Sequence, residues 1–80
     1  MFLEIITPEK TVYSGEIKLI RVPGSDGSFE VLSNHAPIIS TLLKGDIKVI
    51  TKDEQENHFE INGGVIEVRE NKIIVLGEFI

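Results

Sequence analysis

The sequence contains no cysteine and no tryptophan, and Met1 is its only methionine. Without cysteine the fold has neither disulfides nor thiolate metal ligands, the two devices that most often reinforce a small domain. Long apolar runs are also missing, because Glu4 interrupts the apolar residues near the start of the chain. We therefore expect no secretion signal, no membrane-spanning segment and no direct insertion into a membrane.

Basic residues are few, with 8 Lys and Arg against 13 Asp and Glu, which gives a formal net charge of −5. A chain without a basic stripe is a poor ligand for nucleic acid, so no nucleic-acid partner is expected. The acidic excess lies in the flanks and is densest at Asp53, Glu54 and Glu56, whereas the charges between residues 16 and 48 balance. Because the cores of protein interfaces are depleted in charge, the balanced middle is the predicted contact surface.

Helical periodicity is absent: no segment carries apolar residues at i, i+3, i+4 and i+7 over three turns. Short alternating runs appear instead, separated by closely spaced turn signals. We predict an all-β fold in a single domain over residues 1–80. The expected architecture is a two-layer antiparallel β-sandwich, flattened and barrel-like, with about eight to ten short strands and no long helix.

Four local patterns refine this prediction. Residues 24–27 (GSDG) favour a tight turn, because glycine supplies positive φ and Asp bonds its own backbone. Between residues 17 and 22 the apolar alternation switches phase, which predicts a bulge or a strand that leaves one sheet for another. The pair Gly63-Gly64 predicts a tight hairpin. The apolar run at residues 73–76 is typical of a strand buried on both faces.

Chemically active side chains form no known catalytic or ligand motif. His35 has several hydroxyl groups near it in sequence, but a nucleophile needs a positioned base and usually a strained elbow, and neither pattern is present. His58 and the neighbouring acids match no metal-ligand spacing, and the glycine-rich turn lacks the helix and lysine of a phosphate cradle. We predict no catalytic residue, metal or cofactor. His35 is read either as an interface hydrogen-bond partner or as a loop residue that caps nearby carbonyls, and His58 as solvated.

The segment 22–39 (VPGSDGSFEVLSNHAPII) resembles the signature of the epsilon subunit of F-type ATP synthases, called delta in mitochondria. That signature has a glycine-rich turn, a short strand, a polar residue or glycine before His-Ala-Pro, and an aliphatic pair. The segments 13–15, 44–47 and 63–68 resemble the family as well, so the likeness spans nearly all 80 residues in order. Glu30 departs from it, since relatives commonly carry glycine there. The two helices that many members carry as a regulatory arm have no counterpart here, as expected of a naturally short or a truncated form.

The resemblance implies a non-catalytic rotor subunit at the foot of the central stalk. It would dock on the gamma subunit and on the polar loops of the c ring, coupling rotation to ATP synthesis at the cytoplasmic face of the bacterial inner membrane. Carried over by position, Ser28 and Glu30 would face the ring, and His35 and Ser40 would lie nearer gamma. The complete predicted partner interface is Ser28, Glu30, Asn34, His35, Pro37 and Ser40.

Other small β proteins remain alternatives at this stage. A carrier of the biotinyl or lipoyl kind needs a lysine at a hairpin tip, set within a recognisable short motif. Lys10, Lys44 and Lys72 fall in expected turns, but none has that setting. A small barrel enzyme, a sugar-binding domain or another protein-interaction module would need a concave polar pocket that no short motif here indicates.

Overall fold

A computed structural model describes residues 1–79, and every regular element in this part of the chain is a strand. The strands are β1 (Phe2–Ile6), β2 (Thr11–Gly24), β3 (Gly27–Leu32), β4 (Ile38–Leu42), β5 (Gly45–Thr51), β6 (Glu56–Arg69) and β7 (Lys72–Phe79). The predicted all-β class is therefore confirmed. No helix in this range has the length and apolar character needed to cross a membrane.

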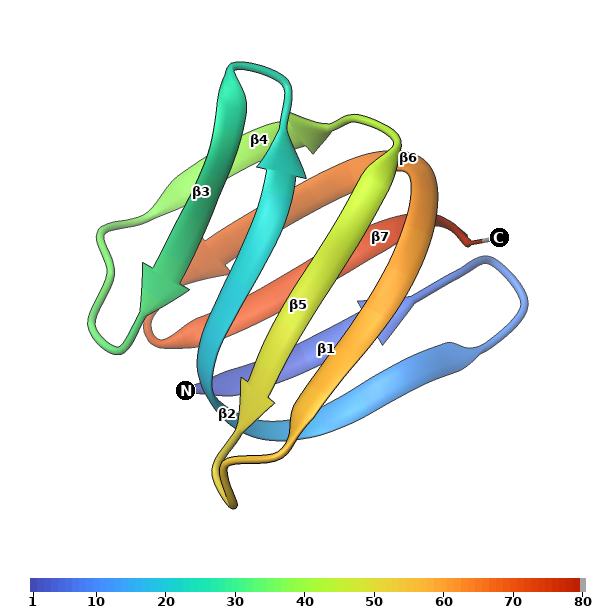
Figure 1. The fold of residues 1–80 in the computed structure, drawn as a ribbon. Helices are drawn as coiled ribbons and strands as arrows, with labels where there is room; N and C mark the ends of the chain where they lie inside the picture. Colours follow the sequence, from blue (N-terminus) through green and yellow to red (C-terminus); the bar gives the residue numbers. More distant parts are fainter. Residues whose placement is uncertain (80) are drawn as a thin grey trace.

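The strands form two layers, one in front of the other in Figure 1. The front layer has four strands, in the order β3, the second half of β2, β5 and the first half of β6. The rear layer has five, in the order β4, the second half of β6, β7, β1 and the first half of β2. We refer to these as the four-stranded and the five-stranded layer. The predicted sandwich is present, and β2 and β6 each belong to both of its layers.

The strand count is lower than the expected eight to ten because β2 and β6 are each 14 residues long. The sequence pattern breaks each of them into two short strands, at the glycines near residues 15 and 63. The chain instead continues in extended conformation from one layer into the other. Pairing is antiparallel throughout the described residues except between β1 and β7, which run parallel.

The predicted phase switch in residues 17–22 is confirmed. The register of β2 against β5 shifts between Ile17 and Leu19, which is a bulge, and there β2 passes from the five-stranded into the four-stranded layer. Ile17 is buried before the shift, and Ile20 and Val22 are buried after it. The extra residue thus keeps the apolar side of β2 toward the core on both sides of the bend.

The hairpin predicted at Gly63-Gly64 is wrong, because both glycines lie inside β6. The register of β6 against β7 shifts between Ile61 and Gly63, where β6 changes layers, and Gly63 has a φ of 153°. Gly64 lies directly opposite Gly77 of β7. A Cβ atom on Gly64 would collide with the carbonyl oxygen of Leu76, and one on Gly77 would lie 2.8 Å from that of Gly63. Glycine is needed here for close approach of two strands, not for a turn.

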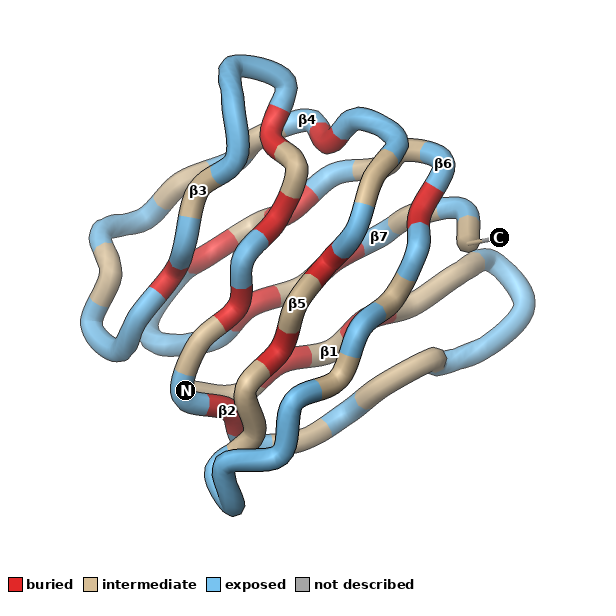
Figure 2. The backbone as a smooth tube through the Cα atoms, in the orientation of Figure 1, coloured by how far each residue is buried: buried red, intermediate tan, exposed pale blue. Residues whose placement is uncertain are grey.

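The buried centre of the core between the layers is aliphatic, and half-buried aromatic residues pack against it. Its buried members are Leu3, Ile5, Ile17, Ile20, Val22, Val31, Leu42, Ile47, Val49, Ile61, Ile66, Val68, Ile73 and Val75. Figure 2 shows these buried positions alternating with exposed ones along the strands, as a sheet with one face toward the core requires. Among the described residues no polar or charged side chain is buried.

The prediction that residues 73–76 are buried on both faces is wrong. Ile73 and Val75 are fully buried, but Ile74 is half-buried and Leu76 is 50% exposed. In a two-layer sandwich each strand has only one face toward the core, so the second apolar face of β7 points outward. That outward face belongs to the candidate site described below.

The contact between Gly64 and Gly77 leads to a test of stability. We expect Gly64→Ala to destabilise the fold by about 1–3 kcal/mol or more, because the added methyl group forces β6 away from β7. Gly15→Ala is the matched control, also within a 14-residue strand. There a Cβ atom would meet no backbone but only the Tyr13 side chain, whose hydroxyl oxygen is nearest at 3.3 Å. Urea unfolding measures both variants. Equal midpoints for the two would contradict this role of Gly64.

Candidate docking surface

The outer face of the five-stranded layer carries a row of uncharged side chains that crosses four strands. Thr41 of β4 lies opposite Val65 of β6, Val65 lies opposite Leu76 of β7, and Leu76 lies opposite Ile6 of β1. Directly opposed residues point to the same side of a sheet, so these four side chains share the outer face. Leu76 is 50% exposed and Val65 is 37% exposed.

A second row extends this surface along the strands. Ile39 lies opposite Glu67, and Glu67 lies opposite Ile74. Ile39 is 71% exposed, the largest exposure among the large apolar residues that the structure leaves open to solvent. We define the apolar face as Ile6, Ile39, Val65, Ile74 and Leu76.

A shallow groove borders the apolar face where β6 changes layers. It encloses about 470 Å³ and is lined in part by Ile6, Gly63, Gly64, Leu76 and Gly77. The glycines leave the strand backbone uncovered at this point. An apolar side chain from a partner can therefore pack against the Ile6 and Leu76 side chains and against the exposed glycine backbone. The groove and the apolar face thus form one continuous surface.

Charged groups interrupt and border the apolar face. Glu67 lies between Ile39 and Ile74, Glu4 lies on the other side of Ile74, and a further charged row lies nearest the β6–β7 turn. Arg69 lies opposite Lys72 in that row, and the Lys72 ammonium is 3.7 Å from the Glu4 carboxylate. An apolar centre with a charged border is the usual composition of a protein–protein contact, and clustered exposed apolar side chains mark such sites. Ile39, Val65 and Leu76 are not among the interface residues predicted from the sequence. Their signal was the apolar run at residues 73–76, which has more apolar residues than one buried face can use.

The structure places Ser28 and Glu30 on the other side of the sandwich. Both are exposed on β3, an edge strand of the four-stranded layer. Glu30 lies opposite Arg21, and Arg21 lies opposite Lys48 of β5. This outer face therefore carries a polar and charged row, and beside it an apolar row that begins at Leu32, which is 53% exposed.

Asn34, His35 and Pro37 lie together in the loop that connects β3 to β4 and hence the two layers. Asn34 has a φ of 64°, and its N–H donates to Oδ1 of Asn71, 2.9 Å away in the β6–β7 turn. The His35 N–H donates to the Leu32 carbonyl, and the His35 ring nitrogen Nδ1 is 2.6 Å from the Ala36 carbonyl oxygen. These hydrogen bonds fix the loop at the edge of the five-stranded layer.

Ser40 is separated from the other predicted interface residues by its orientation. It lies opposite Ile66, a core residue, and is half-buried on the core side of β4. Its hydroxyl donates to the Thr41 carbonyl at 3.0 Å. The six predicted residues therefore occupy three places, namely the outer face of β3, the β3–β4 loop and the inner side of an edge strand.

Comparison with known proteins gives the family. The family model described as ATP synthase, Delta/Epsilon chain, beta-sandwich domain matches residues 1–80. The chain is 41% identical over 76 residues to the ATP synthase epsilon chain of Chlorobium limicola, covering 95% of this chain and 86% of that one. It is also 41% identical over 78 residues to that of Protochlamydia amoebophila, of which it covers 53%.

Solved structures agree on the fold. A chain in the Euglena gracilis mitochondrial ATP synthase structure, described as OSCP/F1/c-ring, superposes with a TM-score of 0.85 at 16% identity over 94% of this chain and 48% of that one. A chain in the central stalk/c-ring structure from Tetrahymena thermophila gives 0.82 at 20% identity, over 98% and 63%. Because the family model matches residues 1–80, this chain belongs to the delta/epsilon chain family of ATP synthases and corresponds to the β-sandwich domain of that family.

Proposed function

We propose that this chain is a non-catalytic subunit of the central stalk of an F-type ATP synthase. It docks on the gamma subunit and on the polar loops of the c ring, and it couples rotation of the ring to ATP synthesis. The observation that carries the proposal is the family match over residues 1–80, together with relatives named ATP synthase epsilon chain. The same match favours this function over that of a biotinyl or lipoyl carrier. The site of action is then the cytoplasmic face of the bacterial inner membrane.

Gamma is the proposed partner of the apolar face. Surfaces that stay buried in a permanent complex are more apolar than the rest of a protein surface, and gamma is the partner to which a stalk subunit stays fixed. Ile39, Val65 and Leu76 are the most exposed members of this face. The β3–β4 loop leads directly into Ile38 and Ile39, so Asn34, His35, Pro37 and Ser40 extend the proposed gamma contact along the edge of the layer.

The c ring is the proposed partner of the β2–β3 hairpin. Its turn carries Ser25 and Asp26, and the exposed side of β3 carries Ser28 and Glu30. Exposed polar side chains on a short edge strand suit contact with polar loops, where hydrogen bonds replace those made to water. Glu30 is a larger residue than the glycine common in the family, so the contact here keeps the ring's backbone farther from β3.

A rigid body suits this mechanical role. Torque passes through a subunit only if its two contact surfaces do not move relative to each other. The layers here are joined by two continuous strands, β2 and β6, and by a close-packed aliphatic core. Sliding of one layer on the other would break hydrogen bonds in both long strands, so the apolar face and the β2–β3 hairpin move together.

Replacing Leu76 by glutamate tests the gamma contact. We expect Leu76→Glu to weaken binding to purified gamma by about tenfold or more, because a carboxylate would be buried against an apolar partner surface. Leu32→Glu is the matched control: Leu32 is 53% exposed, close to the 50% of Leu76, but it lies on β3 in the opposite layer. Calorimetric titration gives the affinities, and circular dichroism verifies folding. A loss of affinity that is equal in both variants would overturn the assignment of gamma to the apolar face.

A bulky side chain on β3 tests the ring contact separately. We expect the wild type to bind a gamma–c-ring complex more tightly than it binds gamma alone. Ser28→Trp should bind gamma alone as the wild type does but should lose this gain in affinity, because the indole holds the ring loops away from β3. Gln55→Trp, at the β5–β6 loop, is the exposed control. Surface plasmon resonance on the two immobilised targets measures both quantities. If Ser28→Trp binds the gamma–c-ring complex as tightly as the control does, the ring does not contact this hairpin.

A further inference from the structure

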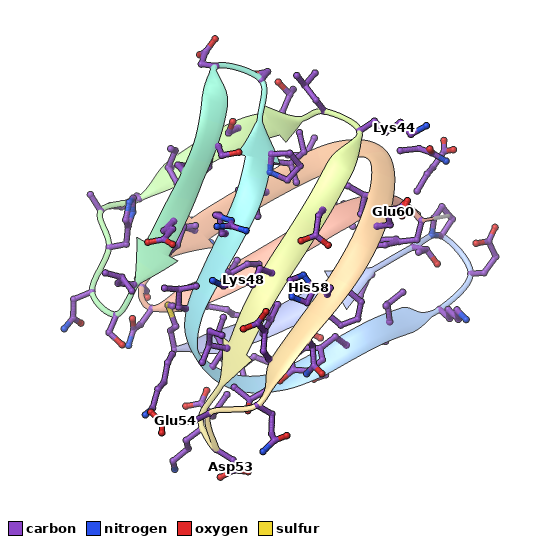
Figure 3. All side chains as sticks on the ribbon, in the orientation of Figure 1. Lys44, Lys48, Asp53, Glu54, His58 and Glu60 are labelled. Atoms are coloured by element: carbon purple, nitrogen blue, oxygen red, sulfur yellow. The ribbon has the colours of Figure 1, made fainter. Side chains whose placement is uncertain are left out.

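His58 makes an unusual pair of contacts on the outer face of the four-stranded layer. Its Nδ1 atom is 2.8 Å from Oδ2 of Asp46, and its Nε2 atom is 2.5 Å from Oε2 of Glu56. A neutral imidazole carries one N–H and therefore donates to one of these carboxylates only. The imidazolium donates to both. The geometry is that of the protonated ring, and the side chain projects outward between β5 and β6 in Figure 3.

The two carboxylates come from both strands of one hairpin. Asp46 lies on β5 opposite Glu60, and His58 lies on β6 opposite Lys48, so the Asp46–His58 contact runs diagonally across the strand pair. Glu56 precedes His58 by two residues on the same face of β6. The imidazolium therefore joins the strands and separates two carboxylates that would otherwise repel each other.

Other charged groups surround this cluster. Lys48 on β5 and Arg21 on β2 act on Glu56 from the same face, and Glu60 lies farther along β6. His58 also lines a groove of about 690 Å³ whose wall includes Glu9 and Lys10 of the β1–β2 turn and Glu78 of β7. The direct contacts made to the His58 ring nitrogens come from Asp46 and Glu56.

We propose that His58 is a proton-dependent clamp on the β5–β6 hairpin. With its proton, the ring holds Asp46 and Glu56 together. Loss of the proton leaves one N–H, so one carboxylate loses its hydrogen bond and this face loses one positive charge. When the lost hydrogen bond is the one to Asp46, the hairpin loses its link between β5 and β6. The clamp is a property of the isolated chain, so its test is independent of the proposed docking function.

The pH range of the clamp follows from its groups. Hydrogen bonds to Asp46 and then to Glu56 raise the pKa of His58 above its ordinary value of 6.5, so this contribution to stability is complete below that value and is lost as the pH rises through the raised pKa. The hydrogen bond to His58 lowers the pKa of Glu56 below its ordinary 4.5, so that contribution is present above 4.5 and is lost as the pH falls through the lowered pKa. The clamp is therefore fully engaged between these two ordinary values.

An NMR titration of the His58 ring tests the proposal. We expect its midpoint to lie above that of the same residue in the urea-unfolded chain, and to fall in both Asp46→Asn and Glu56→Gln. Glu60→Gln is the matched control, because it removes one carboxylate from the same face of β6 without removing a His58 contact. The clamp would be refuted if Asp46→Asn and Glu56→Gln left the His58 midpoint unchanged. It would also be refuted if Glu60→Gln lowered the midpoint as much as those two variants do.

Hydrogen exchange supplies the second measurement. The measured quantity is the exchange rate of the β5–β6 amides, corrected for the effect of pH on intrinsic exchange. In the wild type we expect this corrected rate to rise by about twofold or more as the pH rises through the His58 midpoint, which is the scale expected for exposed ion pairs. In His58→Gln this increase should be absent, while β1 and β7 amides behave alike in both proteins. An equal pH response of the β5–β6 amides in His58→Gln and in the wild type would show that the ring does not hold the hairpin.

Discussion

The close approach of β6 to β7 at Gly64 and Gly77 is the constraint on which the architecture depends. β6 leaves the four-stranded layer after Ile61 and must pair with β7 almost immediately. The register shift at residues 61–63 accompanies this change of layer, and a side chain at either glycine would collide with the backbone of the facing strand. Because β6 also pairs with β4 and β5, an error at this point would displace strands in both layers. Two glycines thereby determine how the layers are stacked on one aliphatic core.

The two outer faces of this core differ in chemistry although the same long strands contribute to both. Residues 56–60 of β6 present Glu56, His58 and Glu60 to solvent. Residues 65–69 present Val65, which lies next to Leu76, together with Glu67 and Arg69. Exposed apolar side chains lower the solubility of a protein. A cluster of them that does not contribute to the core is therefore explained by a partner that covers it. The outer face of the four-stranded layer also exposes Leu32, but its groups around His58 pair with one another.

Sequence reasoning succeeded where the information is local. The turn at residues 24–27 and the phase switch in residues 17–22 each depend on neighbours in the chain, and each is present. It failed where a distant partner decides the structure. A Gly-Gly pair usually indicates a turn. Here the pair lies within β6 because β7 approaches it closely at Gly77, and this contact is not visible in the local sequence. The site was harder still: the resemblance pointed to residues 28–40, while the pairing of β4, β6 and β7 that assembles the apolar face cannot be read from one sequence.

The parallel pairing of β1 with β7 bears on how the molecule is made. β1 finds its antiparallel neighbour β2 within a few residues, but its other edge pairs with β7 and the residue before it, at positions 71–76. On a ribosome the first strand therefore emerges with one edge open, and it stays so until almost the entire domain has been synthesised. Contacts between the ends of a chain close slowly, and unpaired edges in the interval attract other chains. Until β7 is synthesised, this edge of β1 is therefore a site at which nascent copies can pair with one another.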